Sequence, residues 1–335
     1  MRKILLKIGW MDTFEVLKKW VRICYPFRLQ RFVECYEQND KEIKMPAETT
    51  LMDLINLVEI QQGSFLMGTD KPDEFGTKYG RPRHKVQLTQ NFSIGKYLVT
   101  QELWTKVMGY KTSRLKGDTL PINSVSWCEA IVFCNKLSEM LNLQCVYELP
   151  EGFLEELAAY DYDIPDEDDP FAGYAPDLDH LARQIVWNKN ANGYRLPTEA
   201  EWEYCAKAGT ELDYAGSNNI DEVGWYDMNC PKGEGELSWH GQIQAVGLKK
   251  PNAWGLFDMT GNVNELCWDY KDYGLTYQCG DIEIDPTGMD RTTKGRPVTR
   301  GGDFLNRARQ VFERSSAKEA YTRTGNDGFR VVLQS

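Results

Sequence analysis

The chain has 335 residues, of which 41% are hydrophobic and 27% charged, and its formal net charge is −11. This is the composition of a folded soluble protein, and the net negative charge argues against general nucleic-acid binding. No stretch holds the roughly 18 uninterrupted apolar residues of a membrane-spanning helix, and no small-residue cleavage site follows the basic start, so we expect a cytoplasmic protein.

Residues 1–50 are predicted to form a basic helical extension. Apolar side chains recur at steps of three and four from about residue 12 to residue 36, which favours an amphipathic helix that Pro26 ends or kinks. Residues 1–33 contain eight basic and two acidic side chains. We expect this helix to dock on the main domain; the alternative is a helix that contacts a membrane surface or a partner protein.

The main domain is predicted to span residues 51–335. Short strand-like runs punctuated by Gly, Pro and Asn begin near residue 55. Ser126 precedes the apolar stretch WCEAIVFCNKLSEML, so a helix is expected to begin there. The cysteines form no CxxC pair and show no regular spacing, which predicts buried reduced thiols rather than disulfides or a zinc site.

An acidic insertion occupies about residues 147–185. Residues 147–182 hold twelve Asp or Glu and no Lys or Arg. We expect a solvated surface loop with one short helix. The alternative is a docking site for a basic partner, which could be the basic N-terminal helix of the same chain.

A second helix is expected after Thr198. Glu201 stands three residues after Thr198, as a capping box requires, and Gly209 is expected to end the helix. Trp202 should point inward. Arg195 and either Glu199 or Glu203 should tie the helix to neighbouring loops.

Eight motifs occur in the order found in one known family. They are GSFLMG (63–68), PRHKVQL (82–88), YLVTQELWTKVMG (97–109), LPINSVSWCEAIVFCNKLS (120–138), NGYRLPTEAEWEYCAKAG (192–209), NAWGLFDMTGNVNEL (252–266), TRGGDF (299–304) and GFRVV (328–332). In these residues the chain closely resembles the formylglycine-generating enzyme and sulfatase-modifying factor family. The resemblance implies an α+β domain, an elaboration of the C-type lectin fold with little regular secondary structure.

The resemblance also implies a calcium site in GNVNEL. Asn262 and Glu265 match the family's ligand positions, and clustered oxygen donors suit a hard cation. Asn264 and Leu266 replace the aromatic residues that are usual in this motif, so the local packing differs. Calcium is the one cofactor we expect.

Copper is not expected. Family members that oxidise a sulfatase cysteine hold copper through two cysteines that follow the glycine pair. Counted from Gly301 and Gly302, these positions are Asn306 and Val311, and neither supplies the thiolate that Cu(I) requires. We therefore predict a pseudoenzyme. The alternative is an oxidoreductase with a reassigned metal site, for which the chain offers His84, His180 and His240.

Non-catalytic members of the family, such as the variable proteins of diversity-generating retroelements, display a ligand-binding surface between the RGG and GFR motifs. Polar, arginine-bearing and aromatic residues of this kind favour recognition. The candidate ligand-binding residues here are Asp303, Asn306, Arg307, Arg309, Gln310, Phe312, Arg314, Tyr321, Arg323 and Asn326.

The partner of this segment is predicted to be a protein ligand or an anionic surface. Between Arg300 and Arg330 the segment holds seven basic and four acidic residues, a net charge of +3. One alternative is that Arg300 and Arg330 are buried ion-pair partners. Another is that the protein is a non-catalytic subunit of a larger assembly.

Overall fold

The computed structural model describes residues 51–70, 82–160, 176–233, 241–271, 282–288, 295–307 and 309–334. Contacts divide the chain into a unit of residues 1–49 and a unit of residues 50–335. The predicted N-terminal helix and the centre of the acidic insertion lie outside the described residues and stay predictions. The described residues include no helix that is long and apolar enough to cross a membrane.

The helices of the described residues are short, and the longest has 14 residues. They are α3 (Leu51–Ile55), α4 (Gln101–Met108), α5 (Trp127–Met140), α6 (Phe153–Ala159), α7 (Pro176–Gln184), α8 (Glu199–Lys207) and α9 (Ile220–Val223). The predicted starts of α5 and α8 are confirmed: Ser126 and Thr198 each form a complete capping box. Helix α8 ends at Lys207, and Gly209 follows with a φ of +75°.

The strands form small sheets. They are β1 (Leu57–Ile60), β2 (Gly63–Met67), β3 (His84–Leu88), β4 (Phe92–Gly95), β5 (Tyr147–Glu148), β6 (Val186–Trp187), β7 (Tyr194–Arg195), β8 (Asn264–Lys271), β9 (Ile282–Ile284), β10 (Arg296–Arg300), β11 (Ser315–Ser316), β12 (Asp327–Gly328) and β13 (Val332–Gln334). Within the described residues the strand orders are β1-β4-β13-β7, β11-β10-β8-β12, β2-β3-β9 and β5-β6. The mixture of short helices and strands confirms the predicted α+β class.

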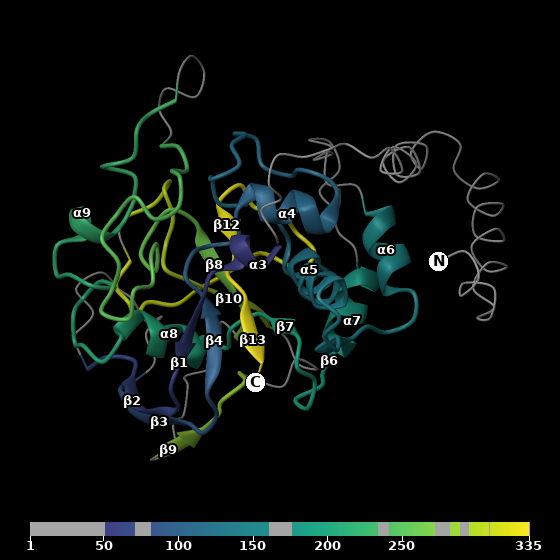
Figure 1. Cartoon of the computed structure of the whole chain (residues 1–335), viewed down its shortest axis with the longest axis horizontal. Coiled ribbons are helices and arrows are strands. Elements are labelled where there is room, and N and C mark those ends of the chain that lie inside the picture. Colours follow the sequence, from purple (N-terminus) through teal and green to yellow (C-terminus); the bar gives the residue numbers. More distant parts are fainter. Residues whose placement is uncertain are drawn as a thin grey trace, which may run out of the picture. The chain divides into compact units, whose positions relative to one another are not determined.

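The C-terminal strand β13 lies between β4 and β7 (Figure 1). The last strand of the described chain therefore pairs in the same sheet as its first strand, β1. Helices α4 to α7 gather on one side of β13 in this view, and α8 lies on the other. Trp104 of α4 stacks on Phe133 of α5 with ring centroids 5.4 Å apart, and Phe329 packs edge-on against both rings. The residues before β13 are therefore part of the core.

The described part of the acidic insertion differs from the prediction of one short helix in a solvated loop. It contains two helices, α6 and α7, which pack against each other. Their apolar side chains at helical spacing enter the core: Phe153, Leu178 and Ala182 are each at most 1% exposed. The sequence signal was the spacing of these residues, which the acidic composition obscured.

Candidate functional site

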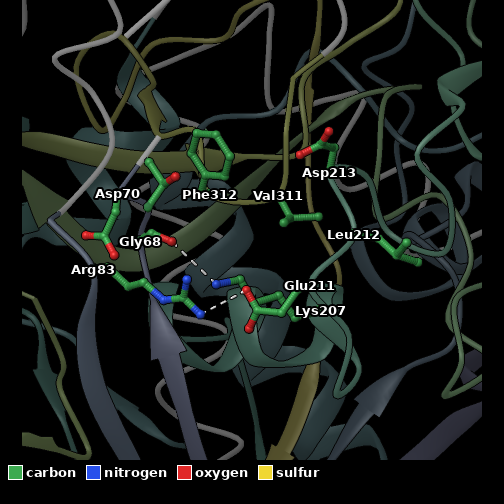
Figure 2. A pocket seen from close by; sticks show the side chains of 10 residues that line it. Gly68, Asp70, Arg83, Lys207, Glu211, Leu212, Asp213, Val311 and Phe312 are labelled. Atoms are coloured by element: carbon green, nitrogen blue, oxygen red, sulfur yellow. Dashed lines mark hydrogen bonds and ion pairs between the residues drawn. The ribbon is translucent and has the colours of Figure 1, made fainter. Parts of the chain in front are cut away.

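A cavity of about 270 Å³ lies where the C-terminal segment meets the end of α8 (Figure 2). Its wall is built from four parts of the chain: the end of β2, the residues before β3, the end of α8 with the loop after it, and the C-terminal segment. The lining residues are Gly68, Thr69, Asp70, Arg83, Lys207, Glu211, Leu212, Asp213, Val311 and Phe312.

The carboxylate of Glu203 joins three of these parts beneath the cavity. Its Oε1 accepts a hydrogen bond from the backbone N–H of Gly68 at 2.8 Å and forms an ion pair with Lys207 Nζ at 3.0 Å. Its Oε2 accepts a hydrogen bond from Arg300. Glu203 is 1% exposed and Arg300 is 0% exposed, so this network is shielded from the screening that weakens surface ion pairs.

Arg300 fixes the backbone that forms one wall. Its Nη1 donates to the carbonyls of Phe312 and Glu313 at 3.1 and 2.9 Å, and its Nη2 donates to the carbonyl of Val311 at 2.9 Å. The backbone N–H of Val311 in turn donates to the carbonyl of Asp213 on the facing wall at 2.9 Å. The positions of Val311 and Phe312 are thus set by the core and not by loop packing alone.

Lys207 lies at the base of the cavity, but its ammonium group is fully occupied. Nζ donates to the carbonyls of Leu66 and Gly68 at 2.5 and 3.5 Å and pairs with Glu203 at 3.0 Å. Three oxygens therefore surround the ammonium group. The role of Lys207 here is to hold β2 against α8.

The described rim of the cavity carries three carboxylates and one guanidinium group. Asp70 and Asp213 lie on opposite sides of Val311 and Phe312 in Figure 2. Glu211 adds a third carboxylate, paired with Arg83 at 3.1 Å. Arg83 therefore offsets the charge of Glu211.

The structure separates the ten candidate ligand-binding residues into three groups. Asn306 and Arg307 are exposed, and Arg309, Gln310, Arg323 and Asn326 are half-buried. The prediction of a surface residue is wrong for the remaining four, because they are buried in the core: Asp303, Phe312, Arg314 and Tyr321. Of the ten, Phe312 lines the cavity.

Asp303 is the centre of a buried amide cluster. Its Oδ2 accepts hydrogen bonds from the side-chain amides of Asn264 and Asn326, both at 2.8 Å. The amide of Asn306 donates to both carboxylate oxygens at 2.8 Å. Asn306, which stands at a copper-ligand position of the family, therefore fixes its own loop through Asp303.

The predicted preference for an anionic surface rested on the +3 charge of the segment, and the structure removes that basis. Four of the seven basic residues pair with glutamates from outside the segment. These pairs are Arg300 with Glu203, Arg314 with Glu199, Arg323 with Glu129, and Arg330 with Glu265. The predicted alternative, that Arg300 and Arg330 are buried ion-pair partners, is confirmed. The four negative charges of these glutamates exceed the net charge of +3 that the segment has by itself.

Asn262 and Glu265 do not fit a calcium ion. Both oxygens of Glu265 accept hydrogen bonds from Arg330, at 2.6 and 2.9 Å, and both residues are fully buried. The amide of Asn262 is bound to the backbone N–H and carbonyl of Gln244 at 3.1 and 3.0 Å. Arg330 therefore already occupies both oxygens of the predicted ligand Glu265. Across the described residues, no group of three or more His, Cys, Asp or Glu is arranged to hold a metal ion.

The second copper-ligand position of the family, Val311, is 3% exposed and packs in an apolar cluster that includes Trp202 and Cys205. Burial raises the pKa of the Cys205 thiol well above its usual range. The predicted candidate His84 is also occupied, since its Nδ1 lies 2.8 Å from the carbonyl of Pro82 and its Nε2 lies 3.5 Å from Glu283. His180 lies on α7, and His240 lies outside the described residues.

Reasoning from the sequence missed most of the cavity. It identified Val311 only as a lost metal position and did not predict Asp70, Glu211 or Asp213. A usable signal was the spacing of Glu199, Glu203 and Lys207 at steps of four on α8, which places all three on one face of the helix. The prediction that Glu199 or Glu203 ties α8 to a neighbouring loop is confirmed by the pair of Glu199 with Arg314, while Glu203 pairs with Arg300 of β10.

Comparisons with known proteins agree with this fold. Residues 42–335 match the model of the sulfatase-modifying factor enzyme 1-like domain. The chaperone protein LppX of Paenibacillus barcinonensis is 38% identical over 197 residues, a match that covers 56% of this chain and 65% of that protein. The formylglycine-generating enzyme of Mycobacterium tuberculosis is 28% identical over 83% of this chain and 98% of its own length.

Relatives without activity match about as well. The inactive C-alpha-formylglycine-generating enzyme 2 of Bos taurus is 26% identical over 74% of this chain and 83% of that protein. Among solved structures, Treponema denticola variable protein 1 superposes with a TM-score of 0.65 at 31% identity, covering 83% of this chain and 95% of that one. The chain therefore belongs to the sulfatase-modifying factor enzyme 1-like family, with both active and inactive relatives, and shares the fold of a variable protein.

Proposed function

We propose that this chain is a non-catalytic recognition protein that binds a protein ligand at the cavity beside its C-terminal segment. The observation that carries the proposal is the chemistry at the two copper-ligand positions of the family. One holds an amide tied to Asp303, and the other holds a valine that forms part of the cavity wall. Neither the amide of Asn306 nor the side chain of Val311 can bind Cu(I) as a thiolate does.

The cavity is suited to binding. Its wall is held by buried ion pairs and backbone hydrogen bonds, so it is preformed, and a preformed site loses little conformational entropy when a ligand enters. The exposed residues Asn306 and Arg307 belong to the same C-terminal segment as the cavity residues Val311 and Phe312. Arg307 is fixed by two hydrogen bonds to Glu313 at 3.2 and 2.9 Å.

The relatives support recognition. One is named as a chaperone, a kind of protein that binds other proteins, and another is named as inactive. The solved neighbour is named as a variable protein, and the resemblance to such proteins implies a ligand surface in the same segment. The six described cysteines are unpaired, which is consistent with a reducing compartment such as the cytoplasm.

The test is a selection of random displayed peptides on the purified full chain. Enriched peptides should bind the wild type and lose at least about tenfold in affinity on Leu212→Trp, because the larger ring fills the cavity that Leu212 lines. The matched control is Leu248→Trp, at a leucine that is 62% exposed and does not line the cavity. Thermal unfolding checks that both variants fold. No enrichment, or equal binding to the two variants, contradicts the proposal.

A further inference from the structure

We infer that the buried cluster around Asp303 and Asp327 binds one hard divalent cation, Ca²⁺. The inference goes beyond the proposed function and does not depend on it. Three observations carry it: two carboxylates meet at one end of a sheet, neutral groups hold them, and an amide beside them has a buried oxygen without a hydrogen-bond partner.

The strand order places both carboxylates at the same end of one sheet. Asn264 begins β8 and lies opposite Asp327, which begins the parallel strand β12. On the other side of β8 runs the antiparallel strand β10, whose last residue, Arg300, lies opposite Glu265 (Figure 1). The chain therefore leaves β10 beside the start of β8, and Asp303 follows directly after the glycine pair.

The side-chain amide of Asn264 connects the two carboxylates. Its Nδ2 donates to Asp303 Oδ2 at 2.8 Å and to Asp327 Oδ1 at 3.2 Å. Because one nitrogen contacts both oxygens, they are at most 6.0 Å apart, the sum of the two distances. Oxygens that share one Ca²⁺ ion lie up to about 5 Å apart, so small side-chain shifts bring both carboxylates onto a single ion.

Neutral groups hold these buried carboxylates. The other amides that donate to Asp303 belong to Asn306 and Asn326, at 2.8 Å each. Asp303 and Asp327 are 1% and 3% exposed, and amide donors leave both negative charges in place. Burial raises the pKa of Asp327 to about 6, and the charge of Asp303 adds to this. A bound cation compensates buried negative charge more fully than neutral donors do.

Asn264 also supplies an oxygen that is ready to become a ligand. Among the described residues its Oδ1 is buried without a hydrogen-bond partner, and the residue is 6% exposed. A half-turn of the amide exchanges Nδ2 and Oδ1 without changing the shape of the group, which directs the oxygen to both carboxylates. Contact with a cation then removes the cost of burying an unpaired oxygen. The aromatic residue that is usual at this position in the family has no such oxygen.

The donor set suits Ca²⁺ better than other ions. Two carboxylates and the amide oxygens of Asn264, Asn306 and Asn326 are hard donors, and Ca²⁺ accepts about six to eight oxygens in irregular geometry. Mg²⁺ requires a near-ideal octahedron, and softer metals prefer nitrogen or sulfur. Asn306 is exposed and Asn326 half-buried, so the cluster reaches the surface on that side. A bound ion ties the loop after the glycine pair to β12.

The experiment is a calorimetric titration of the chelator-treated full chain with CaCl₂ and with MgCl₂ at pH 7.5. We expect one Ca²⁺ per chain with a Kd of about 10⁻⁴ M, and Mg²⁺ binding at least about tenfold weaker. Asp327→Asn should weaken Ca²⁺ binding at least about tenfold, whereas Asn264→Asp should strengthen it about tenfold because it adds a carboxylate. A purely structural role of the cluster predicts no such gain.

The matched control is Asp258→Asn, at a buried carboxylate 3.5 Å from the amide of Asn262, and it should leave the Kd unchanged. The inference is overturned by the absence of saturable Ca²⁺ binding below about 10 mM, well above the Kd of weak protein calcium sites. It is also overturned by an unchanged Kd in Asp327→Asn, or by a loss in Asp258→Asn alone, which would place the ion at the GNVNEL motif.

The Asn264→Asp variant keeps the test decisive if thermal unfolding shows that Asp327→Asn does not fold. Because a ligand of the folded state stabilises it, Ca²⁺ should raise the melting temperature of Asn264→Asp more than that of the wild type. Equal shifts in the two proteins would overturn the inference. Peptide binding at the cavity is measured separately, so either proposal can fail while the other stands.

Discussion

The buried guanidinium of Arg300 offers the sharpest test of how the cavity is held. The change Arg300→Met keeps an unbranched side chain of moderate length and removes the charge and all the donors. It leaves the carbonyls of Val311, Phe312 and Glu313 without this partner and removes one cation from Glu203. We therefore expect Arg300→Met to lower the free energy of unfolding and, at the same time, to change the backbone position of the cavity wall at Val311 and Phe312.

The magnitude follows from burial. Removing one partner of a buried ion pair costs about 3–5 kcal/mol, and each buried acceptor left without a donor costs about 1–3 kcal/mol. These terms do not add fully, because Lys207 and the N–H of Gly68 still bind Glu203. We expect a loss of about 4 kcal/mol, a large fraction of the roughly 5–15 kcal/mol that stabilises a typical domain.

The assay is equilibrium unfolding in urea, with Arg296→Met as the matched control on the same strand. Arg296 pairs with Glu319 at 2.7 Å, but the two side chains are 42% and 33% exposed, so this loss should stay below about 1 kcal/mol. Similar losses in the two variants would refute the reasoning. The reasoning would also be refuted if the Arg300→Met variant were as stable as the wild type and the NMR methyl signals of Val311 were unchanged.

Two further predictions concern the turn that precedes β8. Burial raises the pKa of Asp258 to about 6, so the folded state binds the extra proton between about pH 4 and pH 6, and this group lowers stability as pH rises through that window. Asp258→Asn should therefore stabilise by about 3 kcal/mol at pH 7.5 and by nothing below pH 4; a gain that is the same at both pH values would contradict this. Gly261→Ala should cost about 3 kcal/mol in urea unfolding, since its Cβ would lie 2.1 Å from the carbonyl oxygen of Trp225 at a φ of +73°. Gly255→Ala, at a φ of +78° with no atom within 4 Å, should cost only about 1 kcal/mol, and equal losses would show that the close approach is not the cause.

Local signals in the sequence predicted much of the scaffold. The caps at Ser126 and Thr198 and the inward position of Trp202 depend on residues within one or two turns, and the structure confirms all three. The eight motifs identified the family and therefore the fold. These features are local, so a single sequence contains them.

The candidate site was harder to predict because it depends on long-range pairing. Nothing near Arg314 in the sequence indicates Glu199, which lies 115 residues earlier, and without that pair the arginines appear to form a basic surface. The same pairing removed the calcium prediction, since Arg330 binds Glu265 across 65 residues.

The central claim is recognition in place of copper-dependent oxidation, and the most direct measurement is a Cu(I) titration with a competing chelator, followed by oxygen uptake with a cysteine peptide. The comparison is between the wild type and Asn306→Cys/Val311→Cys, which restores the two thiols of the oxidising relatives. We predict that the wild type retains no stoichiometric copper and consumes no oxygen, while the double variant gains a Cu(I) site. One tightly bound copper per wild-type chain, with peptide-dependent oxygen uptake, would contradict it.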